Sequence, residues 1–123
     1  MSGQNFNIKG LDDFFKQIEN IKNFKKDLQK LIEKHGQKIM DKAILKTPVD
    51  TGQLRRSWTL EKGELYIKIF NNTEYGIHVE YGHRTRGGKS YIEGVYMLKK
   101  SFEKGVKDFE KELEKLLEKY GFK

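Results

Sequence analysis

Residues 47–70, TPVDTGQLRRSWTLEKGELYIKIF, mark the point where the hydrophobic pattern changes from a helical period to a strand period. Pro48 ends the helical pattern before it, because proline pushes the preceding residue out of the α conformation. Further along, apolar residues alternate with polar ones in two short runs: Trp58 and Leu60, then Leu65, Ile67 and Ile69. Lys62-Gly63-Glu64 separates the runs as a turn. We therefore predict a β-hairpin with one buried face over residues 58–70.

The segment before Pro48 carries the apolar stripe of an amphipathic helix. Its members recur at three- and four-residue steps: Leu28, Leu31, Ile32, His35, Ile39, Ala43 and Ile44. An earlier helical run begins at Phe14 and follows Asp12 and Asp13, either of which can cap a helix by accepting from free backbone N–H groups. Asn23 either breaks this helix or caps a new one. Phe6 and Ile8 allow a short strand before it.

The last segment is one long amphipathic helix. Its apolar residues are Leu98, Phe102, Val106, Phe109, Leu113, Leu116, Leu117 and Tyr120. Lys and Glu fill the other faces, so we expect this stripe to be part of the core. The whole pattern predicts an α+β fold with N-terminal helices, a central antiparallel β-hairpin or small sheet, and a long C-terminal amphipathic helix packed on the sheet. At this length we expect a single domain, residues 1–123.

The composition narrows the class of protein. The chain is 36% hydrophobic and 35% charged, and its 8 Phe, 6 Tyr and 1 Trp argue against plain disorder. The absence of cysteine excludes a disulfide framework, a thiol nucleophile and a cysteine-ligated zinc site. No apolar run approaches the ~18 residues of a membrane span, and the first residues lack the apolar core of a signal peptide. We therefore expect a soluble intracellular product with no membrane partner.

The net charge of +7 is concentrated in one stretch. Residues 82–100 carry five Lys or Arg side chains and one acid, Glu93. Within this stretch, residues 82–90, GHRTRGGKS, are predicted to form a flexible, exposed basic loop with Arg84, Arg86 and Lys89. Such a loop is either solvated, or faces an acidic protein neighbour, or contacts nucleic-acid phosphates. The last alternative makes the chain a small basic nucleic-acid-binding protein, although no base-reading module is apparent.

Catalytic and cofactor sites are weakly supported. His78, Glu80 and His83 offer metal ligands, but a zinc site needs three or four convergent ligands with a supporting shell, and nothing else in the sequence completes one. Lys89-Ser90 fits the end of a phosphate-binding loop, but that template requires Gly at position 83, where this chain has His. We therefore expect no enzymatic activity, no cofactor and no metal.

Two segments are specific in combination: residues 47–57, TPVDTGQLRRS, and residues 75–82, YGIHVEYG. Together they resemble the phage head–tail joining and tail-completion family, which is related to the minor tail proteins of long-tailed phages. That family shows A-P-V-D-T-G-x-L-R-x-S after a helix, then Y-A-x-x-V-E-x-G before a loop and a final helix. Residues 8–13 and Met97-Leu98 are also similar to its start and close. Thr47 and Gly76 depart from the pattern, in which alanine is commoner at both positions.

The resemblance implies a structural virion protein at the neck or tail end of a phage or a prophage-derived particle. Such a protein would form a ring, sixfold like the tail tube that it caps. Its partners would be other copies of itself, tail-tube or tail-terminator proteins and head-connector proteins, with non-specific contact to DNA in the lumen. It would be present in the host cytoplasm during assembly and in the virion afterwards.

The motif residues singled out in this way are Pro48, Asp50, Thr51, Gly52, Leu54, Arg55, Tyr75, Glu80 and Gly82. They are either folding devices that place the hairpin between the helices, or contacts between neighbouring subunits of the ring. As folding devices, Asp50 or Thr51 would cap a short turn, and Gly52 would allow a tight backbone path. Glu80 is a candidate ion-pair partner for Arg55 or Arg56, because guanidinium and carboxylate groups pair strongly.

Overall fold

The computed structural model describes residues 10–49, 52–73, 75–84, 88 and 91–122. In chain order it contains helix α1 (Leu11–Lys46), helix α2 (Gln53–Arg56), strands β1 (Trp58–Gly63) and β2 (Tyr66–Asn71), helix α3 (Tyr75–Tyr81), strands β3 (Gly82–Arg84) and β4 (Tyr91–Glu93), and helix α4 (Met97–Lys119). The predicted α+β class is confirmed. The strand predicted at Phe6 and Ile8 lies outside the described residues.

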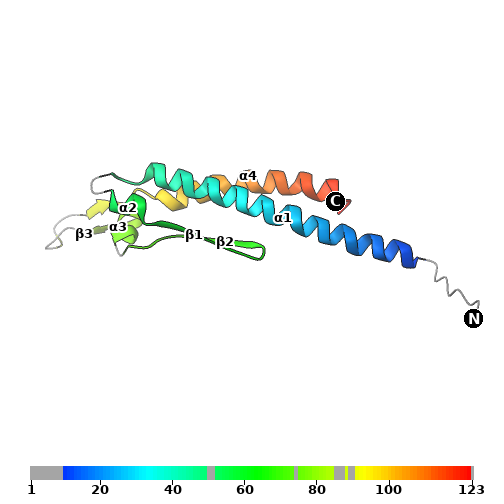
Figure 1. Ribbon diagram of the computed structural model, residues 1–123. Coiled ribbons are helices and arrows are strands. Elements are labelled where there is room, and N and C mark those ends of the chain that lie inside the picture. Colours follow the sequence, from blue (N-terminus) through cyan, green and yellow to red (C-terminus); the bar gives the residue numbers. More distant parts are fainter. Residues whose placement is uncertain (1–9, 50–51, 74, 85–87, 89–90, 123) are drawn as a thin grey trace, which may run out of the picture.

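The molecule is elongated, with α1 and α4 side by side in opposite directions and the β1–β2 hairpin along α1 (Figure 1). The short elements α2, α3 and the β3–β4 sheet gather where α1 ends and α4 begins. At the opposite end, the first turns of α1 extend beyond both α4 and the hairpin. None of the helices in the described part of the chain combines the length and the apolar character that a membrane span needs.

α1 is one unbroken helix of 36 residues, which excludes the alternative in which Asn23 ends a first helix. It begins slightly earlier than the predicted caps. Gly10, with φ 98°, is the N-cap residue, and Asp12 and Asp13 lie in the first turn instead. Their carboxylates still suit the positive end of the helix dipole. The helix ends at Lys46, ahead of Pro48, as predicted.

Small residues allow α1 and α4 to approach closely. Ser101 and Gly105 of α4 are buried, and a Cβ atom added at Gly105 would lie 2.3 Å from Cγ1 of Ile39. The prediction that Phe102 belongs to the core is wrong, because its side chain is 54% exposed. The helix turns the adjacent Ser101 toward α1, where its Oγ lies 3.4 Å from Nζ of Lys46. Phe109 is half-buried.

The hairpin packs on α1 and is held there at its turn. β1 and β2 pair antiparallel from Trp58↔Asn71 to Gly63↔Tyr66, so the turn is Glu64-Leu65, later than the predicted Lys62-Gly63-Glu64. Leu65 has φ 59° and belongs to the turn, not to a strand. Gln29 of α1 accepts a hydrogen bond from the Leu65 N–H (2.5 Å) and donates one to the Gly63 carbonyl oxygen (3.0 Å). These two bonds fix the tip of the hairpin against α1.

The segment predicted as a loop over residues 82–90 begins as a strand. β3 pairs antiparallel with β4, from Gly82↔Glu93 to Arg84↔Tyr91. The loop prediction is therefore wrong for residues 82–84, and β4 was not predicted. Strands of three residues carry too few side chains to show an alternating pattern. The second motif begins as helix α3, Tyr75–Tyr81, which the sequence pattern did not predict.

Candidate functional site

Thr47 links the end of α1 to the hairpin. It is 2% exposed, and its Oγ1 donates a 2.6 Å hydrogen bond to the carbonyl oxygen of Ala43. Oγ1 of Thr47 also accepts a 2.8 Å hydrogen bond from Nε1 of Trp58, the first residue of β1. A buried hydroxyl needs such partners. The hydroxyl group that Thr47 has in place of the family's commoner alanine therefore has both a hydrogen-bond acceptor and a donor within the core.

The rest of the first motif folds the chain back onto Thr47. Gly52, with φ 73°, adopts a left-handed conformation that favours glycine and precedes the single turn of α2. Leu54 in that turn is buried, and its carbonyl oxygen accepts a 2.7 Å hydrogen bond from Nδ2 of Asn71. Nε of Arg55 donates to the carbonyl oxygen of Thr47 at 3.1 Å. The motif thus joins the end of α1, α2 and the end of β2.

Glu80 in the second motif caps the start of α4. The residue is 6% exposed; its Oε1 accepts from the Leu98 N–H at 2.7 Å and its Oε2 from the Lys99 N–H at 2.8 Å. The free N–H groups and the dipole at a helix N-terminus both favour a carboxylate. The predicted ion pair of Glu80 with Arg55 or Arg56 is wrong, because both carboxylate oxygens are bound to α4 and Arg55 donates to backbone carbonyls.

The chain passes very close to α3 before α4 begins. The N–H groups of Val95 and Tyr96 donate to the carbonyl oxygens of Val79 and Glu80, at 2.7 and 3.0 Å. A Cβ atom added at Gly94 would lie 2.4 Å from the Glu80 carbonyl oxygen, so only glycine fits there. Sequence reasoning missed Gly94, for which the available signal was one isolated glycine just before the last helix.

These contacts bring the two motifs together at one place, which we call the motif junction. Leu54, Val79 and Met97 form a buried cluster there, with Trp58 packed against it. Gly82 has φ 88° where α3 passes into β3. The motif residues Asp50 and Thr51, the side chain of Tyr75, and the basic residues Arg86 and Lys89 lie outside the described part of the chain.

An apolar groove of about 600 Å³, which we call the motif groove, lies beside the junction. Both strands of the hairpin, α3 and the start of α4 contribute to it, with Trp58, Ile69, Phe70, Ile77, Tyr81 and Leu98 among its lining residues. Ile77 is 62% exposed. Nζ of Lys68 lies 5.2 Å from the centre of the Phe70 ring. Aromatic and aliphatic side chains with a cation beside them suit a protein segment better than a polar metabolite.

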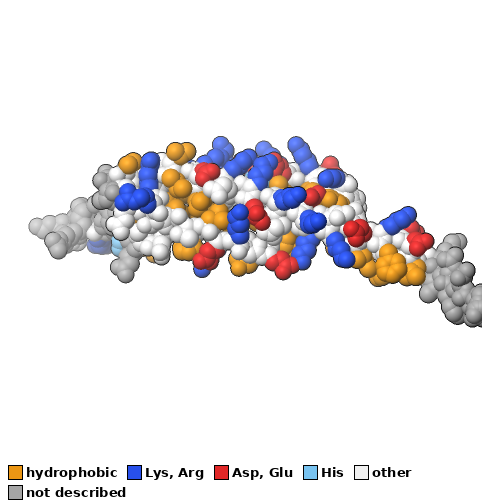
Figure 2. Space-filling model, viewed as in Figure 1, with side chains coloured by type: hydrophobic (Ala, Val, Ile, Leu, Met, Phe, Trp, Pro, Cys, Tyr) orange, Lys and Arg blue, Asp and Glu red, His pale blue; other side chains and the backbone are white. Residues whose placement is uncertain are grey.

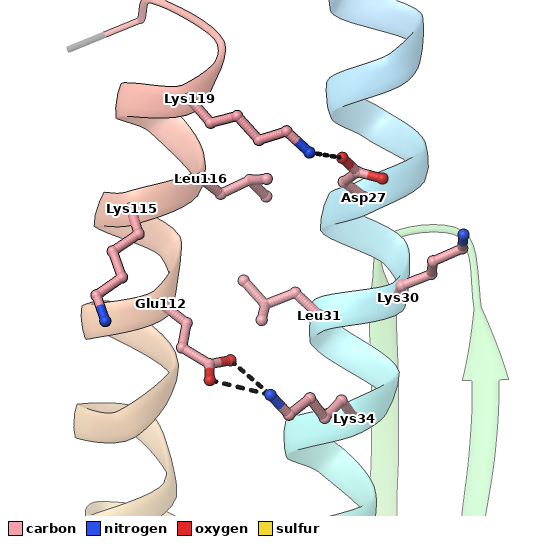
Figure 3. A pocket seen from close by; sticks show the side chains of 8 residues that line it. All are labelled: Asp27, Lys30, Leu31, Lys34, Glu112, Lys115, Leu116 and Lys119. Atoms are coloured by element: carbon pink, nitrogen blue, oxygen red, sulfur yellow. Dashed lines mark hydrogen bonds and ion pairs between the residues drawn. The ribbon is translucent and has the colours of Figure 1, made fainter.

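A second groove, of about 520 Å³, follows the contact between α1 and α4 and is called here the seam groove (Figure 3). Its charged residues are Asp27, Lys30, Lys34, Glu112, Lys115 and Lys119. Lys34 and Lys119 form ion pairs with Glu112 (3.0 Å) and Asp27 (3.3 Å). Hydrogen bonds from His35 and Lys34 lower the pKa of Glu112 to about 2. With four lysines and two carboxylates, the groove has a net positive charge.

Among the described residues, no group of three or more His, Asp or Glu side chains is placed to hold a metal ion. Glu80, one of the three candidate ligands in the sequence, is bound to the backbone of α4. The side chain of His83, another of them, lies outside the described part of the chain.

A family model matches residues 11–82, more than half of the chain. It is the HK97-gp10-like family, described as "Bacteriophage HK97-gp10, putative tail-component". The chain belongs to this family. The resemblance to phage tail proteins that the two motifs indicated is therefore confirmed. No curated protein and no solved structure matches the chain.

The HK97-gp10-like segment contains both motifs and ends at Gly82, so β4 and α4 lie beyond it. The family segment nevertheless holds α4 directly, because Glu80 caps that helix and Leu54 and Val79 pack against Met97. The similarity noted for residues 8–10 and for Met97-Leu98 falls outside the match. In this HK97-gp10-like protein, the motif residues described here have structural partners within the same chain.

Proposed function

We propose that this chain is a structural protein of the phage neck or tail end, which joins or completes the tail for attachment to the head. Its membership of a tail-component family, over the residues that contain both motifs, carries the proposal. The exposure of large apolar side chains near both ends of the elongated molecule supports it. Apolar side chains gathered at a surface are typical of protein–protein contact sites.

The proposal includes a ring of identical subunits, with six copies matching the tail tube. A ring requires a heterologous contact, in which one surface of each copy meets a different surface of the next. Its two faces would contact the tail-tube or tail-terminator protein and the head connector. The protein would be present in the host cytoplasm during assembly and in the virion afterwards.

The proposed role requires no catalysis. Two charged motif side chains, those of Arg55 and Glu80, hydrogen-bond to backbone groups and thereby stabilise the fold. We infer that the motifs act as folding devices that shape an interaction surface, the motif groove, which lies beside them.

Gene deletion in the phage or prophage that encodes the chain tests this role. We expect filled heads and finished tails to accumulate separately, as counted by electron microscopy, and infectivity to return with a plasmid copy. A plasmid copy with Glu110→Gln, at an exposed position of α4, is the matched control and should restore infectivity fully. Normal infectious particles from the deletion strain would contradict the proposal.

DNA in the lumen is a second candidate partner, and the seam groove favours it. Lys30 and Lys115 are exposed and form no ion pair among the residues that the structure describes, so both ammonium groups can reach phosphates. We expect a short DNA duplex to bind weakly, with affinity that falls steeply as salt rises. Binding with Kd below about 1 µM at physiological salt, together with a deletion strain that assembles normally, would instead indicate a nucleic-acid-binding protein. The double variant Lys30→Glu, Lys115→Glu should abolish the weak binding.

A further inference from the structure

The first turns of α1, residues 11–22, form a projecting segment that we call the α1 arm (Figure 1). Of the hydrogen bonds between α1 and the end of α4, the one nearest the start of α1 runs from Nδ2 of Asn20 to the Tyr120 carbonyl oxygen, at 2.9 Å. The hairpin tip reaches α1 at Lys25, which pairs with Glu64. Most of the arm therefore lies beyond the elements that cover the rest of α1.

The arm carries an apolar stripe that is mostly exposed in the described chain, with Ile18 half-buried. Its residues Leu11, Phe14, Phe15, Ile18 and Ile21 recur at helical spacing and share one broad face. Phe14, Phe15 and Ile21 are 55–57% exposed. Figure 2 shows the corresponding cluster of hydrophobic side chains on the projecting end of the molecule. A helix of this kind needs a partner surface, because its stripe is otherwise left in water.

The motif groove is a complementary surface at the other end of the molecule. Its lining is mostly apolar, and two lysines lie next to lining residues: Lys68 over the ring of Phe70, and Lys99 directly after Leu98. The arm begins with two acids, Asp12 and Asp13, beside its exposed phenylalanines. Arm and groove thus match in apolar character, and the two acids at the start of the arm are opposite in charge to the lysines beside the groove, although the arm also carries Lys16, Glu19 and Lys22.

We propose that the α1 arm of one copy docks in the motif groove of the next copy, an assignment that rests on the proposed ring. One rigid chain cannot bring its own arm to its own groove, because α1 holds the two at opposite ends. A contact between two different surfaces is heterologous and repeats from copy to copy until the ring closes. Part of the groove lining lies within or next to the motifs, such as Trp58, Ile77 and Tyr81, so the motifs contribute to the receiving surface for the arm.

Cysteine cross-linking tests this contact directly, because the chain has no cysteine of its own. Phe15→Cys and Ile77→Cys change exposed residues in the arm and at the groove, so neither change disturbs the core. When the two purified variants are mixed and oxidised, we expect a disulfide-linked dimer containing one chain of each. Leu45→Cys, 73% exposed on α1 away from the arm, is the matched control and should not cross-link to Phe15→Cys.

Two results would overturn the assignment. One is self-cross-linking of Phe15→Cys at the yield of the mixture, which would show that two arms pair with each other. The other is no cross-link between Phe15→Cys and Ile77→Cys, either in solution or in particles assembled from both variants.

A double variant separates this inference from the proposed function. Phe14→Ser with Phe15→Ser should keep the circular dichroism spectrum and Tm of the wild type within about 2 °C, because both side chains are exposed. We expect it to lower the infectivity restored to a deletion strain at least tenfold. Full rescue by this variant would refute the arm assignment and leave the neck role standing, whereas a deletion strain that needs no rescue would refute the neck role itself.

Discussion

The carboxylate of Glu80 accepts a 2.7 Å hydrogen bond from the backbone N–H of Leu98, and this contact joins the family segment to the last helix. The N-cap residue of α4, Tyr96, has φ 53° and supplies no side-chain cap. Glu80, which belongs to the separate helix α3, provides the side-chain cap instead. The start of α4 is therefore held by a residue that lies 18 positions before Leu98.

Removing this cap should destabilise the fold. Glu80→Gln keeps the size but replaces a charged acceptor, and we expect it to lower the free energy of unfolding by about 1–3 kcal/mol. Urea denaturation followed by circular dichroism measures the change. Glu103→Gln, on the exposed face of α4, is the control and should stay within about 0.5 kcal/mol of the wild type. Equal stabilities of the two variants would show that the cap contributes nothing.

Gly105→Ala should destabilise the protein even though alanine favours helices by about 1 kcal/mol. The new Cβ would lie 2.3 Å from Cγ1 of Ile39, so α1 and α4 would have to separate. We expect a net loss of about 1–2 kcal/mol. In a double-mutant cycle with Ile39→Ala, the combined loss should be smaller than the sum of the single losses, because the shortened side chain makes room for the Cβ. Additive losses would contradict the close contact.

Phe102 and Phe109 should differ although both belong to the same sequence stripe. Phe102→Ala should cost less than about 1 kcal/mol, because the side chain is 54% exposed. Phe109→Ala should cost about 2 kcal/mol, since its half-buried ring packs against His35 with 5.8 Å between ring centroids. Thermal and urea denaturation measure both. Similar losses at the two sites would show that the face of α4 is assigned wrongly.

Acid should weaken the seam between α1 and α4 through Glu112. Its pKa is about 2 in the folded chain, below the ordinary 4.5, because His35 and Lys34 hydrogen-bond to the carboxylate. A carboxyl with a lowered folded pKa stabilises the fold above its unfolded pKa, and that stabilisation is lost as the pH falls through the folded pKa. The wild type should therefore be more stable than Glu112→Gln at pH 6, and the difference should shrink between about pH 4.5 and pH 2. A difference that does not change with pH would exclude this role for Glu112.

The sequence by itself determined the elements that are long enough to show a period. The stripe before Pro48, the alternation from Trp58 to Ile69 and the stripe from Leu98 to Tyr120 became α1, the hairpin and α4. The two motifs also indicated the family, because their residue types and spacing are specific without any structure.

Only the tertiary structure decided the short elements and the partners of the polar groups. α3 and the β3–β4 pair are too short to carry a period. They are held beside the start of α4 by backbone hydrogen bonds from Val95 and Tyr96 to Val79 and Glu80, which the close approach at Gly94 allows. The sequence stripe placed Phe102 in the core, but close approach of two helices favours Ser101 and Gly105 at the contact instead. Glu80 accepts hydrogen bonds from backbone N–H groups of α4 and does not pair with an arginine, because the fold places the start of that helix beside it. Local spacing specifies which segments are helix or strand, whereas the distance between packed elements decides which side chain each one meets.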